Sequence, residues 1–505
     1  MPHAPPRDVS DPPSTPGCHR LNVHPPCPET DGSILNRNLQ WWLLGGLIFL
    51  ILFARSPGVL LLPPLQAEDG SHVFAYFYEH REPIQILREK AGYIPLLANL
   101  IGYLSVRLPA TMIPYGLTWL PLLLTLAAYS LFFSRRYRVI IASDAVRALV
   151  CLLFALAPLS QFHLLAHTDY SIWNALLLLI LLGGMPLPAG SARAAPCWLL
   201  INLLVWAHPL SIVLLPLQLY FAWRDRSRRA WYLATALNLV LYQYLGTKGG
   251  QVFAHQDLLS ILALLGRSLV ATVTMLGDIA SRTVLGQPLF AWARQHMGFL
   301  IVYVDLAVIL LVGCAAVLDA GYRRLAWVLL YLMAGMTFLS LLSRGLSLAD
   351  LETYRGGPRY CYLQSLGVLV LLAGGVSSLL SSPAGRRALH PALPSPGRMI
   401  CAAALLHYYL LNTQYGHYLV VNADAKDPAY QKSPYYPGNP MNGRIVQTFF
   451  RDLAASEANL QPGYAARLVA EKPGDWPIDI TVGGAASPDH CPSTRRLCRL
   501  VQPFD

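Results

Sequence analysis

The feature that most constrains this chain is a series of long apolar runs, which recur from residue 41 to residue 420 and are separated by short polar or basic stretches. Most of these runs have roughly 17 to 22 residues, the length that an α-helix needs to cross the hydrocarbon core of a bilayer. Hydrophobic residues make up 54% of the chain and charged residues 13%, whereas charged residues are about a quarter of a typical soluble protein. The pattern predicts an all-α polytopic membrane protein.

Basic residues are concentrated between the apolar runs, and this distribution predicts how the chain is oriented. The clusters 135–138 and 224–229 directly follow apolar runs, as expected for loops on the cytoplasmic side. The formal net charge of +11 therefore reports membrane topology and does not indicate a nucleic-acid partner. Residues 1–37 are rich in proline and polar residues, which predicts a disordered tail. The orientation predicts that this tail is cytoplasmic and that loop 55–111 and segment 421–505 are external.

Counting the apolar runs in this orientation predicts about 11 transmembrane helices. The stretch 258–276 is also long enough to span, but counting it would place the basic pairs 323–324 and 386–387 on the wrong side. We therefore expect an interfacial or re-entrant segment there. The expected spans are 38–54, 112–133, 145–161, 171–185, 196–207, a run ending at 223, 230–245, 299–318, 325–342, 360–380 and 400–420.

Two adjacent carboxylates, Glu68 and Asp69, follow the first apolar run and open the expected external loop. Ionisable side chains at the edge of a bilayer are costly to desolvate, and this makes them candidates for function. A structural alternative is that they cap the segment that follows, as acidic residues at a helix start often do. The aromatic stretch 72–79 and a second amphipathic run up to residue 107 predict interfacial helices in this loop.

Basic side chains also recur in the later external loops. Arg355 and Arg359 lie in a Gly/Pro-rich loop just before a late span, with Tyr360 next to them, and Lys248 lies in a Gly-rich turn. A guanidinium matches phosphate oxygens bidentately, so these residues suit a phosphate or pyrophosphate group. The alternative is that Arg355 and Arg359 extend from a helix end to the phosphates of ordinary lipids.

Several external histidines are further candidates. His72 lies one turn after Asp69 and could orient it or contact an acceptor, although packing is an alternative role. His163, His167 and Asp169 form a second external cluster. Metal ligands must converge in space, and nothing in the sequence predicts that these residues do. We therefore expect no metal and no cofactor, with a divalent cation left open.

An external carboxylate pair and an external arginine loop together indicate a definite reaction. A polyprenyl-phosphate-linked sugar would present its anomeric carbon at the outer edge of the bilayer, where basic side chains hold the phosphate leaving group. A carboxylate would take the proton from an acceptor hydroxyl. The product would have an inverted anomeric centre.

This arrangement resembles the C-type (GT-C) superfamily of membrane glycosyltransferases, over about residues 38–420. The similarity lies in an acidic motif after the first span, interfacial helices behind it and an Arg-Tyr motif opening a late span. The motifs 67–70 and 91–93 resemble bacterial members that modify surface polysaccharides or glycoproteins.

The resemblance implies a general base at Asp69, with Glu68 as the less favoured holder of that role. It implies donor phosphate binding by Arg359, Arg355, Lys248 and Tyr360, and orienting or acceptor contacts by His72, Tyr93 and His167. It also implies a multi-pass protein of the bacterial inner membrane with a periplasmic active site. Its partners would be the lipid bilayer, a polyprenyl-phosphate sugar and a glycan, glycolipid or protein acceptor.

Two other functions remain open. A transporter or flippase of lipid-linked saccharides should show internal repeats, broken helices and charges buried inside its spans, whereas this sequence shows no repeat and its charges cluster mainly outside the spans. A ligase or polymerase of lipid-linked glycans would share the phosphate-binding residues, but it depends on arginine-rich external loops rather than on an acidic first loop. The segment 421–505 is polar and Pro/Gly-rich, which predicts a small external extension; whether Cys491 and Cys498 form a disulfide there stays open.

Overall fold

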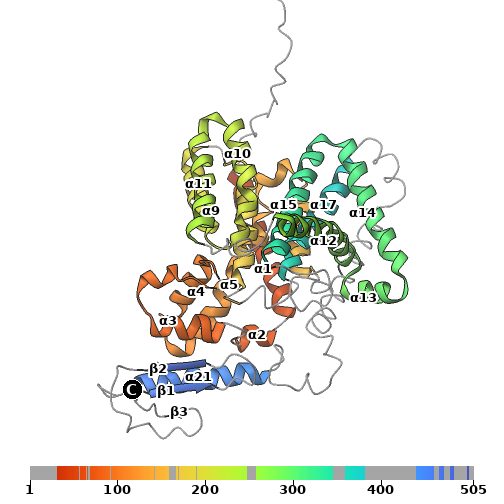
Figure 1. Cartoon of the computed structure of the whole chain (residues 1–505). Helices are drawn as coiled ribbons and strands as arrows, with labels where there is room; N and C mark the ends of the chain where they lie inside the picture. Colours follow the sequence, from red (N-terminus) through yellow and green to blue (C-terminus); the bar gives the residue numbers. More distant parts are fainter. Residues whose placement is uncertain are drawn as a thin grey trace, which may run out of the picture. The chain divides into compact units, whose positions relative to one another are not determined.

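We describe the protein from a computed structural model of the whole chain. Helices predominate among the described residues, and three short strands lie near the C-terminal end (Figure 1). The chain divides into two compact units, Met1–Trp42 and Leu43–Asp505, and all contacts given below lie within the second. The structure describes residues 31–55, 57–63, 65, 69–90, 92–141, 143–157, 167–168, 170–188, 190–246, 258–344, 359–381, 406, 440–459, 466–470, 478–482 and 498–499.

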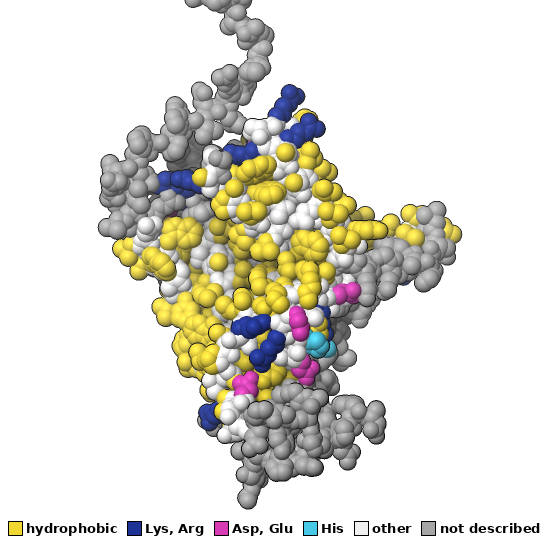
Figure 2. Space-filling view, turned by 90° about the vertical axis from the view of Figure 1, so that its left-hand side faces the viewer, with side chains coloured by type: hydrophobic (Ala, Val, Ile, Leu, Met, Phe, Trp, Pro, Cys, Tyr) yellow, Lys and Arg dark blue, Asp and Glu magenta, His cyan; other side chains and the backbone are white. Residues whose placement is uncertain are grey.

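Six stretches of the described helices are long and apolar enough to cross a membrane. Hydrophobic side chains on them, such as Leu47, Val302 and Leu310, are exposed, as expected where lipid replaces water. Figure 2 shows a broad hydrophobic zone on one face, with Lys and Arg gathered above it and charged side chains of both signs below. The protein is therefore a membrane-embedded, mainly helical chain. The six stretches are Asn38–Arg55, Ala110–Val139, Leu259–Leu285, Gly298–Leu318, Ala320–Leu342 and Cys361–Leu379.

Two segments differ from the sequence-based expectation. The helix α1 (Asp31–Arg55) begins at Asp31, so residues 31–37 are helical and do not belong to a disordered tail. The helix α12 (Leu258–Leu285) is continuous over 28 residues, about 42 Å, and is longer than the interfacial segment expected at 258–276. Because α12 is long and apolar enough to span, the total of eleven spans stays a prediction.

The apolar runs between residues 144 and 245 form shorter helices, some of them broken by proline. Proline lacks the N–H that a helix interior needs, and here the 3-10 turn η5 (Pro209–Leu214) separates α9 from α10. His208 caps this turn, because its Nδ1 accepts a hydrogen bond of 3.1 Å from the N–H of Leu210. The helices of this part are α6 (Asp144–Leu156), α8 (Ser171–Gly183), α9 (Ser191–Val205), α10 (Leu215–Arg224), η6 (Arg226–Arg228) and α11 (Arg229–Leu245).

Among the remaining helices, α12, α14 (Gly298–Leu318), α15 (Ala320–Arg344) and α17 (Arg359–Ser381) pack on one another, whereas α5 (Ile113–Leu131) packs mainly on α8. Gly286 joins α12 to the next helix with φ +75°, a left-handed conformation that glycine adopts without a steric cost. The other elements are η4 (Arg135–Val139) and α13 (Gln287–His296).

The basic cluster 135–138 lies at the C-terminal end of α8. Arg136 donates from Nη2 to three carbonyl groups at this end, at 2.7–2.8 Å, where a cation is favourable because the helix dipole is negative. Arg228 donates to the carbonyl of Leu187 at 2.8 Å, so the cluster 224–229 lies at the same end. The two clusters that predict cytoplasmic loops therefore meet in the fold.

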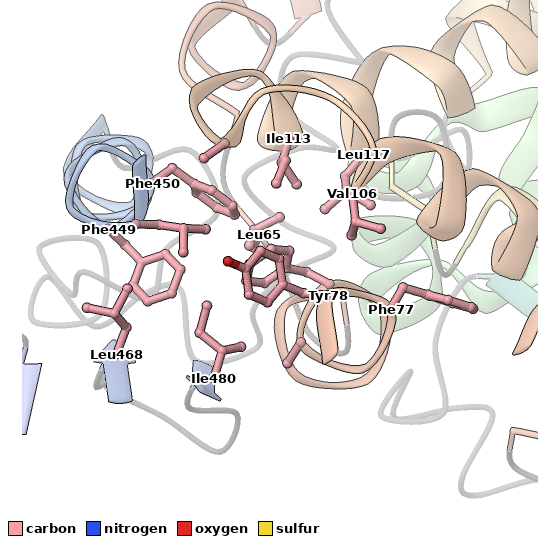
Figure 3. Packing of buried hydrophobic residues seen from close by; sticks show 14 of the residues in the cluster. Leu65, Phe77, Tyr78, Val106, Ile113, Leu117, Phe449, Phe450, Leu468 and Ile480 are labelled. Carbon is pink, nitrogen blue, oxygen red and sulfur yellow. The ribbon is translucent and has the colours of Figure 1, made fainter. Parts of the chain in front are cut away.

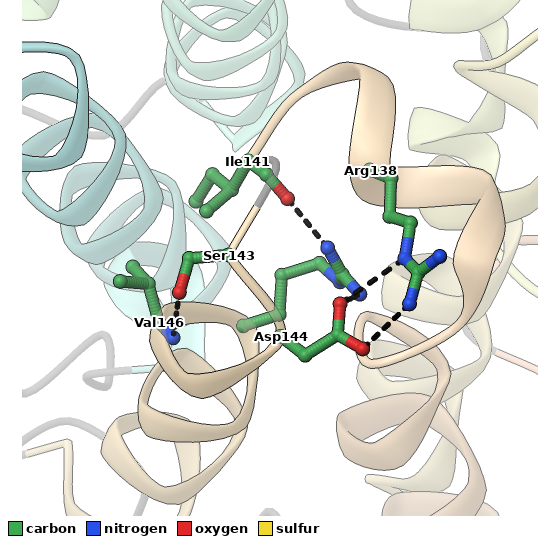
Figure 4. Close-up of polar contacts among 6 residues, drawn as sticks. Arg138, Ile141, Ser143, Asp144 and Val146 are labelled. Atoms are coloured by element: carbon green, nitrogen blue, oxygen red, sulfur yellow. Dashed lines mark hydrogen bonds and ion pairs between the residues drawn. The ribbon is translucent and has the colours of Figure 1, made fainter. Parts of the chain in front are cut away.

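The start of α6 is held at this end by an ion-pair network (Figure 4). Arg138 binds Asp144 through two hydrogen bonds of 3.1 and 2.7 Å, and the buried Arg147 pairs with the same carboxylate. Arg147 also donates to the carbonyl of Ile141 at 2.6 Å. The hydrogen bond from Arg138, followed by the weaker effects of Arg147, lowers the pKa of Asp144.

We expect this network to make stability depend on pH in the acid range. Because the pKa of Asp144 is lower in the folded chain, its contribution is complete above the unfolded value of about 4 and is lost as the pH falls through the folded value. Asp144→Asn should cost about 1 kcal/mol at pH 7, since the Asp144 side chain is 44% exposed and exposed pairs contribute little. Thermal unfolding of the purified protein at pH 7 and pH 3 would test this. An equal effect of the substitution at both pH values would contradict it.

The loop between α1 and α5 and the C-terminal segment share one hydrophobic core (Figure 3). Phe74 from the loop packs edge-on against Phe450 of the C-terminal helix, with ring centroids 4.8 Å apart. Two strands close the core from below with Leu468 and Ile480. The elements are α2 (Pro57–Leu61), the π-helix η1 (Asp69–Ala75), α3 (Tyr76–Glu79), η2 (Pro83–Leu87), α4 (Leu96–Ser105), η3 (Ala110–Met112), α21 (Pro440–Asn459), β1 (Ala466–Ala470), β2 (Ile478–Val482) and β3 (Cys498–Arg499).

The three strands form an antiparallel sheet in the order β2-β1-β3, in which Leu468 pairs with Ile480 on one side and Cys498 on the other. The all-α expectation is therefore wrong for the C-terminal segment. Cys491 lies outside the described residues, so whether it forms a disulfide with Cys498 stays open. Since the sheet and α21 pack on the first loop, both segments lie on the same side of any membrane that the bundle crosses.

A hydrogen bond ties the two segments together at the edge of this core. The hydroxyl of Tyr78 donates to Oε1 of Glu457 at 2.6 Å, and Arg81 lies 3.8 Å from the same oxygen. Burial, together with the Glu457 carboxylate, raises the pKa of Tyr78 above its ordinary value. Tyr78 therefore keeps its proton at neutral pH and is the donor of this bond.

Candidate functional site

Asp69 lies in the interior, at the start of the π-helix η1. It is 1% exposed, and its Oδ2 lies 3.1 Å from Nδ1 of His167. The backbone N–H of Thr168 donates to the same oxygen at 3.2 Å. The fold thus brings together an acid and a histidine that are 98 residues apart in the sequence.

The position of this pair is fixed by the start of α8. Thr168 donates from Oγ1 to the carbonyl of Leu117 in α5 at 2.7 Å, and Ser171 donates from Oγ to the carbonyl of Thr168 at 2.6 Å. On the opposite side, η1 packs closely on α4: a Cβ at Gly102 would lie 2.5 Å from Cγ1 of Val73. Glycine at this position allows that close approach.

The surroundings of Asp69 hold its carboxyl group in one position, between the backbone N–H of Thr168 and the imidazole of His167. The site also lies next to the N-terminal end of α8, where the helix dipole is positive. A buried carboxylate held against an imidazole is an arrangement that can accept and release a proton.

The start of α17 lies at the same end of α8 as Asp69. The hydroxyl of Tyr362, in the first turn of α17, donates to Oδ1 of Asn174 at 2.8 Å, and Asn174 lies one helical turn after Ser171. Arg359 and Tyr360 are the first two residues of α17. The backbone of the predicted phosphate-binding motif and the predicted base therefore approach the same turn of α8, whereas the Arg136 cluster lies at the other end of this helix.

Tyr93 belongs to a neighbouring aromatic group. Its ring lies edge-on to that of His208 at 5.4 Å, and His208 lies 4.8 Å from Trp173 in the first turn of α8. The N–H of Ile94 donates to the carbonyl of Gly246 at 2.9 Å. The loop that carries Tyr93 is thus bound to the end of α11, two residues before Lys248.

Other candidates are not part of these contacts or lie outside the described residues. His72 contributes its carbonyl, which accepts a hydrogen bond of 3.0 Å from Arg88, while the imidazole recorded beside Asp69 is that of His167. Sequence reasoning missed Thr168 and Asn174, because a backbone N–H and a buried amide leave no signal in the sequence. The residues outside the described part are Glu68, Lys248, Arg355, His163 and Asp169.

Within the part of the chain that the structure describes, no group of three or more His, Cys, Asp or Glu side chains could hold a metal ion. The Asp69–His167 pair by itself supplies two possible ligands. The chemistry that these side chains support directly is proton transfer.

Comparisons of the chain with protein-family models, with curated proteins and with solved structures found no match.

Proposed function

We propose that the protein is an inverting glycosyltransferase that moves a sugar from a polyprenyl-phosphate donor to a glycan, glycolipid or protein acceptor. The observation that carries this proposal is the buried contact between Asp69 and His167. It places a proton-accepting group in the first loop after α1, next to the end of a bundle of apolar helices. A lipid-borne substrate reaches such a position from the bilayer.

In this proposal Asp69 is the general base. The oxygen of the acceptor hydroxyl attacks the anomeric carbon, and the bond from that carbon to the phosphate oxygen breaks. The hydroxyl proton goes to the Asp69 carboxylate, and the electron pair leaves with the polyprenyl phosphate. His167 and the N–H of Thr168 keep the carboxylate in place, which keeps the base within reach of the hydroxyl.

The donor phosphate would bind near the start of α17. Arg359 and Tyr360 begin this helix, and Tyr362 one turn later is bonded to Asn174 of α8. Arg355 and Lys248 remain candidates from the neighbouring loops. A cation close to the leaving phosphate stabilises the charge that develops as the glycosidic bond breaks.

The basic clusters support a periplasmic reaction in a bacterial inner membrane. Arg136 and Arg228 lie at the C-terminal end of α8, whereas Asp69 lies at its N-terminal end. If the basic end is cytoplasmic, then Asp69, the C-terminal segment and the start of α17 face the other side.

The experiment compares cells with and without the protein. Mass spectrometry of surface glycans, glycolipids and glycoproteins should show one sugar missing in cells that lack the protein, and its polyprenyl-phosphate form should accumulate. If the protein were a flippase, cells without it would still contain a separate, active transferase. Donor supplied from the external side of spheroplasts would then restore the missing sugar. Normal glycans in the absence of the protein would contradict the proposal, and so would rescue by external donor.

A further inference from the structure

Arg55, the last residue of α1, lies partly buried among three other helices. Its Nη1 donates to the carbonyl of Ala155 in α6 at 2.5 Å. The guanidinium also lies near the hydroxyl groups of Tyr129 in α5 and Tyr362 in α17. The guanidinium therefore points into the bundle and bonds to the backbone of α6.

Two buried arginines elsewhere in this chain are neutralised by a carboxylate. Arg147 pairs with Asp144, and Arg282 lies 3.8 Å from Asp278. Among the described residues, no Asp or Glu lies within ion-pairing distance of Arg55. A cation that is partly removed from water without a counter-charge is costly, so an anionic ligand beside Arg55 would offset that cost.

The neighbouring hydroxyl groups cannot supply that counter-charge. Tyr362 donates to Oδ1 of Asn174 at 2.8 Å, and the Tyr129 and Tyr362 hydroxyls are 2.7 Å apart. Because Tyr362 gives its proton to Asn174, the proton between the two tyrosines comes from Tyr129. Both hydroxyls are therefore uncharged and held in place by their own hydrogen bonds, beside a guanidinium that has five N–H donors.

The anion that fits this position is a phosphate group. A guanidinium binds phosphate oxygens through two parallel hydrogen bonds. Arg55 ends an apolar helix, so a ligand that arrives from the bilayer would place a headgroup near it. Through Tyr362 and Asn174, Arg55 is also connected to the turn of α8 that follows the Asp69 site.

We infer that Arg55 is an anion-binding residue that holds the phosphate group of a ligand at the end of α1, beside the Tyr129–Tyr362 pair. The identity of that ligand as a polyprenyl phosphate rests on the function proposed above. A phospholipid headgroup or free phosphate would offer the same chemistry, and the test separates the three sources.

The test measures ligand binding to the purified full chain in a maltoside detergent, by native mass spectrometry. The probes are a polyprenyl phosphate, the same prenol without phosphate, phosphatidylglycerol and inorganic phosphate. We expect Arg55→Gln to weaken phosphate binding about 10- to 100-fold, the usual range for a hydrogen bond to a charged group. Arg224→Gln is the matched control, because Arg224 also ends an apolar helix, bonds to Tyr220 and is exposed.

Each outcome has a definite meaning. Selective loss of polyprenyl phosphate binding in Arg55→Gln supports the inference, and the same loss with phosphatidylglycerol or inorganic phosphate supports it with that source. Equal binding of the prenol and its phosphate, or unchanged binding in Arg55→Gln, overturns it. If Arg55→Gln is not monodisperse, Arg55→Lys replaces it, because lysine keeps the charge without the two-pronged geometry. Wild-type affinity in Arg55→Lys then overturns the inference.

The result is independent of the proposed reaction. Asp69→Asn should bind polyprenyl phosphate as the wild type does, since Asp69 is assigned to the proton and not to the phosphate. If the wild type transfers no sugar from a polyprenyl-phosphate donor while Arg55→Gln loses phosphate binding, the glycosyltransferase proposal fails and the anion site stands. Retained transfer in Asp69→Asn would remove only the role of Asp69 as the base. If the protein transfers sugar while Arg55→Gln binds phosphate as the wild type does, only the anion site fails.

Discussion

Replacing Asp69 with asparagine is expected to lower the rate of sugar transfer by about 10²- to 10⁴-fold, the usual contribution of a general base. Asparagine has nearly the same size and keeps an oxygen that can accept from the N–H of Thr168, so the fold around the site should persist. It cannot take a proton from the acceptor hydroxyl. The measurement is release of polyprenyl phosphate from the donor by purified protein.

The matched control is Glu82→Gln, which removes a carboxylate from the same loop. Glu82 is exposed and its side chain makes no cap bond to η2, so the rate should stay within about twofold, as for most surface substitutions. His167→Asn should have an intermediate effect, because it removes a group that orients the base. Wild-type activity in Asp69→Asn would show that Asp69 only fastens η1 to α8, and the capping role left open by the sequence would then be correct.

The arrangement of charges along the chain could be predicted from the sequence, because it follows from simple alternation of sides. The clusters around Arg136 and Arg228 both lie at the C-terminal end of α8, and Asp69 lies at its N-terminal end. Which of these two ends faces the cytoplasm stays a prediction from the positions of the basic residues.

The contact between Asp69 and His167 could be recognised only in part. Both residues stand out in the sequence as ionisable groups in loops that are expected to be external, but nothing in either loop specifies the partner. The contact depends on how α5 and α8 pack, because Thr168 is bonded to Leu117. Packing of this kind is set by many apolar side chains together, and no single spacing reveals it.

The position of the C-terminal segment was beyond sequence reasoning for a different reason. Phe449 and Phe450 lie in α21 without an obvious partner nearby in the chain, and the side chains that bury them belong to a loop nearly four hundred residues earlier. The helix α12 extends beyond the interfacial segment expected at 258–276. The positions of basic loops bear on whether an apolar run crosses the membrane, but they do not indicate where its helix ends.

The shared core has a functional consequence. The π-helix that begins with Asp69 is bounded by α4 at Gly102 and by α21 at Phe450. π-helical turns are less stable than α-helical ones and are often found at functional sites. The C-terminal segment therefore helps to hold the turn that carries the proposed base, although its residues lie far from Asp69 in the sequence.

Phe450→Ala is expected to destabilise this shared core by about 3–5 kcal/mol, the usual cost of removing a buried phenylalanine. Phe450 is 0% exposed and contacts Phe74 and Phe449 edge-on, so a cavity would remain between α21 and η1. Local opening should become faster in both segments, because they bury each other. Hydrogen exchange of the purified full chain, followed on peptides from 69–79 and 440–459, measures this directly.

Phe299→Ala provides the control, since Phe299 is 57% exposed on α14 and its loss leaves no buried cavity. Exchange in both peptides should then match that of the wild type. If Phe450→Ala speeds exchange in 440–459 while 69–79 stays as protected as before, then α21 packs on the loop without supporting it. The result expected here, faster exchange in both, would mean that removing a side chain near the C-terminal end loosens the turn that begins at Asp69.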